Sequence, residues 1–94
     1  MINRQHAFTD LVNDYSKDKL TLLNSTFEKA SLIYSSGNIC EALLSFRFIQ
    51  KECDSLLCTI GQEFFMKLSL LLSGVRDAII ECESLLEENY HAVD

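Results

Sequence analysis

The chain has 94 residues, of which 48% are hydrophobic and 23% charged, with three glycines, no proline and a formal net charge of −6. This length fits one domain, and so apolar a chain of moderate charge does not belong to the disordered class. Because acids outnumber bases and no Lys/Arg stripe is present, the composition argues against nucleic-acid binding. The scarcity of helix-breaking residues predicts an all-α fold.

The four cysteines are expected to be free thiols rather than a disulfide framework. The start of the chain, MINRQHAFTD, lacks the apolar segment of a signal peptide. Three of the cysteines fall at apolar positions of a helical pattern, where a free thiol behaves as a small hydrophobe. These features indicate a cytoplasmic protein. The longest apolar run, FFMKLSLLLSGV, is too short for a membrane span and is interrupted by Lys67.

The first third of the chain predicts helix in one or two pieces. An apolar row with spacings 3, 4, 3, 4 runs through Leu20, Leu23, Phe27, Ala30 and Tyr34. A shorter amphipathic stretch precedes it, formed by Phe8, Leu11, Val12 and Tyr15. One long helix is open, and so is a short helix followed by a kink and a long helix. We favour the second, with helices at about 5–15 and 17–36, because Ser16 can cap a new helix.

A second helix is predicted over about 38–60. Its apolar seam steps 3, 4, 3, 4, 3, 4 through Ile39, Ala42, Phe46, Ile49, Cys53, Leu56 and Ile60. Asn38 is a good N-cap, and Glu41 three residues later completes a capping-box pattern. Gly37 suits the left-handed position that ends the preceding helix, and Gly61 suits the same position at the far end.

A third helix is predicted over about 62–90, and its apolar face is unusually wide. One row comprises Phe65, Leu68, Leu72, Val75, Ile79, Cys82 and Leu86. A second row beside it comprises Phe64, Leu71, Ala78 and Leu85. Two adjacent rows suggest two neighbours, so this helix is expected to be the central element. Short connections then predict one domain over 1–94, an antiparallel three-helix bundle with a short extra N-terminal helix as an option.

No constellation in the sequence indicates an enzyme or a metal protein. His6 and His91 lie near the termini, without a partner at the spacing of a nucleophile–base pair. Cys53 and Cys58 are five residues apart, which places them about 140° apart on a helix and makes a shared zinc ion improbable. We therefore expect a non-enzymatic protein with no catalytic residues, no cofactor and no metal site.

Apolar side chains that point away from the predicted core are the candidate functional residues. The expected partner-binding residues are Leu44, Phe48, Met66, Leu70 and Ile80. Apolar residues on outer faces often complete their burial against another chain or an amphipathic helix. A protein partner and a second copy of the chain, giving a homodimer, are both open. Residues 63–94 carry seven acids against two bases, a net of −5, which is either a solvated face or an attraction for a basic partner.

The stretch FEKASLIYSSGNICEALLSF resembles one tetratricopeptide-type helical hairpin. Ala30 and Ala42 match the small positions of that motif, Gly37 its turn and Phe46 its aromatic position. The same hairpin is similar to microtubule-interacting-and-transport domains, three-helix bundles that take a helical peptide in a groove. These resemblances imply a protein-binding function.

A longer resemblance is to the small helical export chaperones of flagellar and type III secretion systems. It rests on boundary motifs at Ser16, Lys19 and Leu20, at Gly37, Asn38 and Ile39, and at Gly61, Gln62 and Glu63, together with Leu68 and Arg76. The resemblance implies a bundle that shields an aggregation-prone helix of a secreted subunit. The expected function is a chaperone-like or adaptor module that docks an amphipathic helix, and the alternative is a structural homo-oligomer without a separate client.

Overall fold

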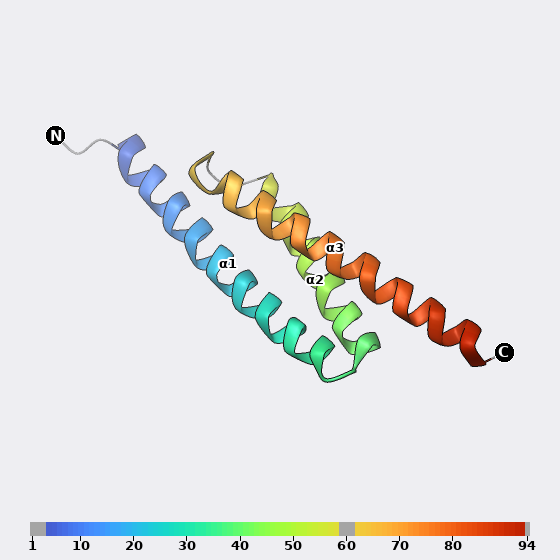
Figure 1. The fold of residues 1–94 in the computed structure, drawn as a ribbon. Helices are drawn as coiled ribbons and strands as arrows, with labels where there is room; N and C mark the ends of the chain where they lie inside the picture. Colours follow the sequence, from blue (N-terminus) through green and yellow to red (C-terminus); the bar gives the residue numbers. More distant parts are fainter. Residues whose placement is uncertain (1–3, 59–61, 94) are drawn as a thin grey trace.

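Three helices follow one another along the chain. The computed structural model describes residues 4–58 and 62–93, with side chains described for 15–58 and 64–88. The helices are α1 (Arg4–Ser35), α2 (Ile39–Leu57) and α3 (Gln62–Val93). Consecutive helices run in opposite directions, so α1 and α3 point the same way and α2 runs opposite to both (Figure 1). The described parts of the chain contain no strand, and the all-α three-helix architecture is confirmed.

The three helices are staggered. α2 has 19 residues, against 32 in each of the other two helices. The first part of α1 extends beyond one end of α2, and the last part of α3 extends beyond the α1–α2 turn at the opposite end (Figure 1). The molecule is therefore elongated, with extents of 72 × 19 × 15 Å.

The central element is α2, and the expectation that the third helix is central is wrong. α2 packs extensively on both α1 and α3, whereas α1 and α3 touch each other only sparsely. Both neighbours meet α2 through its single apolar stripe. The wide apolar face of α3 packs mainly on α2 and borders α1 at Ala78.

α1 is one continuous helix, so the favoured break at Ser16 is also wrong. No proline or glycine interrupts the sequence there, and Ser16 lies four residues before Leu20, in register with the apolar row. Its side chain is fully buried, and its hydroxyl oxygen has no hydrogen-bond partner. A serine in this position continues the helix rather than capping a new one.

The turn between α1 and α2 follows the predicted glycine signal. Gly37 has φ +93°, its N–H donates to the carbonyl of Tyr34 at 3.0 Å, and the N–H of Asn38 donates to the carbonyl of Ile33 at 3.2 Å. These two bonds form a Schellman motif. The predicted capping box differs: Asn38 occupies the N-cap position without a side-chain capping bond, and its amide instead donates to the Glu41 carboxylate at 3.2 Å.

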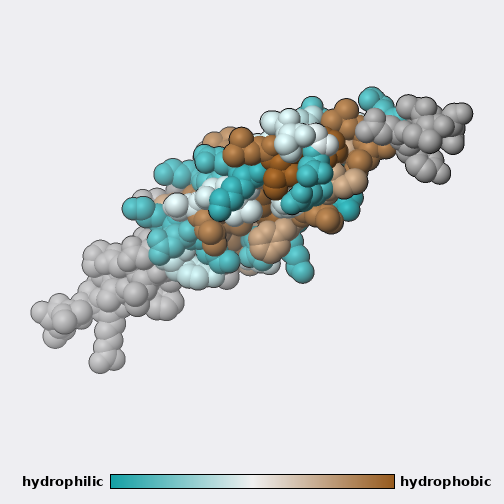
Figure 2. Space-filling view, turned by 90° about the horizontal axis from the view of Figure 1, so that it is seen from below, coloured by the Kyte–Doolittle hydropathy of each residue, from teal (hydrophilic) through white to brown (hydrophobic). Residues whose placement is uncertain are grey.

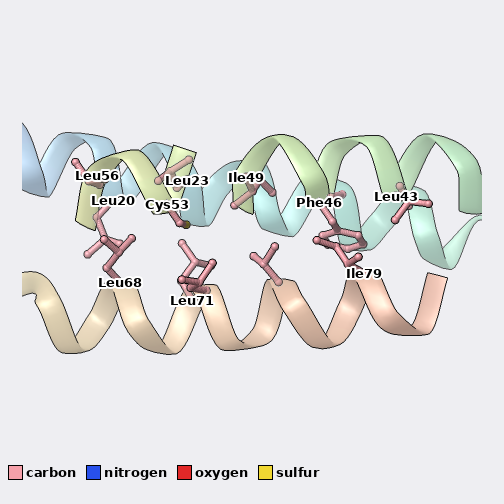
Figure 3. Packing of buried hydrophobic residues seen from close by; sticks show 14 of the residues in the cluster. Leu20, Leu23, Leu43, Phe46, Ile49, Cys53, Leu56, Leu68, Leu71 and Ile79 are labelled. Carbon is pink, nitrogen blue, oxygen red and sulfur yellow. The ribbon is translucent and has the colours of Figure 1, made fainter. Parts of the chain in front are cut away.

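The core is a row of aliphatic and aromatic side chains between α2 and its two neighbours (Figure 3). Phe46 is 2% exposed and meets Phe27 of α1, with ring centroids 5.5 Å apart and planes at 55°. Ile49, Leu68 and Val75 are fully buried. Each such side chain contributes about 1.5–3 kcal/mol by leaving water. Packing of the α2 stripe against both neighbours therefore holds the three helices together.

One predicted core residue lies outside the core. Phe65 is 53% exposed, and the neighbouring Phe64 is the aromatic side chain that packs against the cluster. A row with a 3.5-residue repeat drifts by about 20° per heptad around a straight helix of 3.6 residues per turn. Two heptads separate Phe65 from the buried Ile79, which is enough to rotate it out of the core. The roles predicted for Ile60 and Gly61 lie outside the described residues.

Candidate partner-binding surface

All five predicted partner-binding residues are exposed. Their exposed fractions run from 55% for Phe48 to 70% for Met66. Figure 2 shows a face on which apolar side chains lie exposed among polar ones along the middle of the molecule. The five do not share one surface, however, because they lie on different sides of α2 and α3.

Leu44 and Phe48 form a pair one turn apart on the outer side of α2. Leu57 marks the side of α2 that borders α3, since it lines the groove between these two helices. Around the helix axis, Leu44 lies about 140° and Phe48 about 180° from Leu57. The pair therefore faces away from the α2–α3 seam.

The three residues on α3 lie closer together. Ile80 lines the α2–α3 groove, and so does Asp77. Met66 and Leu70 lie within about 20° of Asp77 around the axis of α3, so they continue the outer rim of the groove along the helix. The structure thus brings Met66, Leu70 and Ile80 to one surface and leaves the α2 pair outside it.

The groove between α2 and α3 has a volume of about 470 Å³. It is lined by Leu57 of α2 and by Phe65, Ser69, Leu72, Ser73, Arg76, Asp77 and Ile80 of α3. Phe65 and Ile80 are both more than half exposed, and Ser69 and Ser73 lie between them. The small side chains of Ser69 and Ser73 leave the floor of the groove lower than its two large apolar residues.

Two ion pairs cross the seam beside the groove. Arg76 lies 4.0 Å from Asp54, and Arg47 lies 3.2 Å from Glu83. All four side chains are about half exposed, and such pairs contribute only about 0–1 kcal/mol.

Two smaller hollows lie on the other seams. The hollow between α1 and α3 has a volume of about 170 Å³ and includes Tyr34 and Glu81. The hollow between α1 and α2 has a volume of about 230 Å³ and includes the ion pair of Lys19 with Glu52 at 3.3 Å. Each has about half the volume of the α2–α3 groove or less.

The thiols and carboxylates of the described residues were compared with the requirements of a metal site. No group of three or more potential metal ligands is found there. Cys53 and Cys82 are buried, and burial raises the pKa of the Cys53 thiol to about 11. A thiol with so high a pKa is a poor nucleophile at neutral pH.

The groove residues Phe65, Ser69 and Ser73 were missed by the sequence analysis. The spacing of four residues from Phe65 to Ser69 and from Ser69 to Ser73 is a signal for one shared face. That signal was hidden because Phe65 fits the apolar row of the core equally well.

The chain matches no protein-family model, and comparisons with curated proteins and with solved structures find no match. Within the described residues, no helix combines the length and apolar character needed to cross a bilayer.

Proposed function

We propose that this protein is a non-enzymatic binding module that docks an amphipathic helix of a partner protein in the α2–α3 groove. The observation that carries the proposal is the pair of large exposed side chains, Phe65 and Ile80, at the two ends of one hollow. An apolar groove between helices can bind the apolar stripe of an added helix. The anchoring residues of that stripe are spaced three and four residues apart.

The dimensions of the groove fit such a ligand. Ile80 follows Phe65 by 15 residues on a continuous helix, a rise of about 22 Å. A partner helix of about four turns therefore spans the groove from one anchor to the other. Phe65 and Ile80 act as the ends of the contact, and a central side chain of the partner packs over the two serines.

The role within a cell follows from the resemblance to export chaperones. A groove that covers the apolar stripe of a client helix keeps that helix from aggregating before its assembly or export. The client in this proposal is either a subunit of a secretion apparatus or a protein that the apparatus exports. The compartment is the cytoplasm.

The first experiment measures the solution mass of the pure protein by sedimentation velocity across a dilution series, together with binding of a designed amphipathic peptide of about 18 residues. The proposal expects a monomer whose peptide binding is lost in Ile80→Asp. The matched control is Leu32→Asp, because Leu32 is 71% exposed on α1. Binding must survive in this control.

Other outcomes assign the surface differently. A stable dimer that dissociates in Ile80→Asp makes a second copy the occupant and supports the structural homo-oligomer instead. Peptide binding that is lost in Phe48→Asp but retained in Ile80→Asp moves the site to the outer face of α2. A monomer that binds no amphipathic peptide contradicts the proposed function.

A further inference from the structure

The sequence of α3 becomes strongly acidic from Asp77 onward. Residues 64–76 carry two bases, Lys67 and Arg76, and no acid. Residues 77–88 carry no base and five acids, which are Asp77, Glu81, Glu83, Glu87 and Glu88. These charges do not all share one face, because Lys67 lies about 180° from Arg76 around the helix axis. On the groove side, Arg76 is followed by Asp77, Glu83 and Glu87.

Acidic residues on the groove side of α3 follow the last anchor, Ile80. Asp77 lines the groove itself. Glu83 and Glu87 follow Ile80 by three and seven residues, which places them on the same face of α3. Both are exposed, and Glu83 is in contact with Arg47 of α2 across the seam.

The facing helix does not neutralise this charge. α2 carries three acids and two bases, a net of −1. Its two bases are Arg47, which already meets Glu83, and Lys51. Any chain that lies along the groove toward the end of α3 therefore enters a negative potential.

We propose that the occupant of the α2–α3 groove is a basic amphipathic helix of another protein, whose basic N-terminal half lies against residues 77–88. This inference rests on the proposed function and adds the charge and the direction of the partner. Opposite charge across an interface raises the association rate and selects among partners that share the same apolar stripe.

A second copy of the chain fits this surface less well. Each copy has a net charge of −6, so approach of two copies is repulsive. An antiparallel pairing of two α3 helices through this face sets one base of each copy, Arg76, against Asp77, Glu83 and Glu87 of the other. Arg76 already lies 4.0 Å from Asp54 within its own chain.

The direction follows from the helix dipole. The N-terminus of a helix carries a partial positive charge and is stabilised beside acidic groups. A partner that runs antiparallel to α3 places both its N-terminus and its basic residues beside residues 77–88. It then runs parallel to α2.

The chain contains two exposed cysteines at which a label can report the direction of the bound partner helix. Cys40 and Cys58 are both exposed and are 18 residues apart, which is five full turns and about 27 Å along α2. They lie on the same side of α2 as Arg47, within about 20° of it around the axis. Cys40 is thus at the acidic end of the groove, and Cys58 is at the other end.

The experiment uses three capped peptides of about 18 residues with one identical leucine stripe. The first has lysines in its N-terminal half, the second has glutamates there, and the third has lysines in its C-terminal half. Binding to the full chain is measured by fluorescence anisotropy at low and high salt. We expect the first peptide to bind at least about tenfold more tightly than the second and severalfold more tightly than the third, with both ratios falling as salt screens the charges.

Variants connect the preference to residues 77–88. In Asp77→Asn/Glu83→Gln the ratio between the first two peptides should fall, while the binding of the glutamate peptide stays the same or strengthens. The matched control, Asp18→Asn/Glu28→Gln, removes two exposed acids from α1 and should leave the ratio unchanged. A nitroxide on Cys40, with Cys58→Ser, should broaden the N-terminal amide signals of the first peptide. A nitroxide on Cys58, with Cys40→Ser, should broaden its C-terminal signals.

The two proposals fail in different ways. Equal affinity for the lysine and glutamate peptides, with both lost in Ile80→Asp, overturns the charge inference and leaves groove docking intact. A reversed broadening pattern overturns the direction. Salt-sensitive binding that survives in Ile80→Asp reflects charge attraction alone and overturns both proposals, as does the absence of binding by all three peptides.

Discussion

The hydroxyl of Tyr34, near the end of α1, donates a 2.8 Å hydrogen bond to Oε1 of Glu81 on α3. This bond joins the two helices that otherwise touch each other only sparsely. It lies beside Phe46 and Ala78 in the hollow between α1 and α3. The Tyr34–Glu81 bond thus connects α1 to α3 at the hollow between these two helices.

The first prediction concerns the ionisation of Tyr34. The hydrogen bond to Glu81 raises the pKa of Tyr34 above its ordinary value of 10.0, because the phenolate loses this bond and faces a carboxylate. A raised pKa in the folded state means that the stabilisation is complete below pH 10 and is lost as pH rises through the raised value. Titration of absorbance at 295 nm should show a late tyrosine step that Tyr34→Phe removes. Glu81→Gln should shift that step to lower pH, and an unchanged step would contradict the assignment.

Two phenylalanines two residues apart on α2 should respond in opposite ways. Phe46→Ala should lower the free energy of unfolding by about 3–5 kcal/mol, because it removes a buried ring that packs against Phe27. Phe48→Asp should change it by no more than about 0.5 kcal/mol, since Phe48 is 55% exposed. Urea unfolding followed by circular dichroism measures both. A large loss in Phe48→Asp would mean that the two faces of α2 are exchanged.

The glycines at positions 37 and 74 provide a matched pair. Gly37→Ala should destabilise the protein by about 1–2 kcal/mol, because its φ of +93° is unfavourable for any residue with a Cβ, although space is open around it. Gly74→Ala should stabilise it by about 0.5–1 kcal/mol, because alanine favours the helix and its Cβ would lie 3.8 Å from Cζ of Phe27. Thermal unfolding should therefore shift in opposite directions for the two variants.

Replacing Ser16 by alanine should make the folded protein more stable. Its hydroxyl oxygen is buried without a hydrogen-bond partner, and a polar group left in this way costs about 1–3 kcal/mol. Ser16→Ala removes that cost at little change in volume. The control is Ser25→Ala on the exposed side of α1, which gains only the helix propensity of alanine, about 0.5 kcal/mol. We expect the melting temperature to rise more in Ser16→Ala, and an equal rise in both would contradict the burial argument.

The four thiols should separate into two classes. Cys40 and Cys58 are exposed and should react with Ellman's reagent within minutes at pH 8, whereas Cys53 and Cys82 should react only after unfolding. The pKa of Cys53 is about 11, raised from 9.0 chiefly by burial, so the free energy of unfolding should depend on pH. The contribution of the Cys53 thiol to the stability of the fold is complete below pH 9. It is lost as pH rises through 11, because the thiol ionises first in the unfolded chain. The stability difference between the native chain and Cys53→Ala should shrink from pH 8 to pH 10.5.

The helices were predictable where the periodic pattern and a breaker agreed. Gly37 follows a regular apolar row, and α1 ends where that glycine takes its left-handed conformation. At Ser16 only a weak signal was present, because a serine is compatible with both a cap and a buried helical position. The neighbouring α2 decides between the two by packing against that side of α1, and this information is tertiary.

The candidate surface was predictable in part for a related reason. The exposure of Leu44, Phe48 and Ile80 follows from their angle to the seam, and the structure agrees. Which exposed residues share a surface depends on the rotation of α3 relative to α2. A row of 3.5-residue period leaves that rotation uncertain by tens of degrees over two heptads, so Phe65 could not be assigned to the groove from sequence.

The central position of α2 also has a consequence for the order of folding. α2 belongs to two helical hairpins at once, one with α1 and one with α3, and each hairpin joins segments that are close in sequence. Chains dominated by such local contacts reach the native state within about microseconds to milliseconds. We therefore expect either hairpin to be able to form first, with Phe46 of α2 buried in the completed bundle.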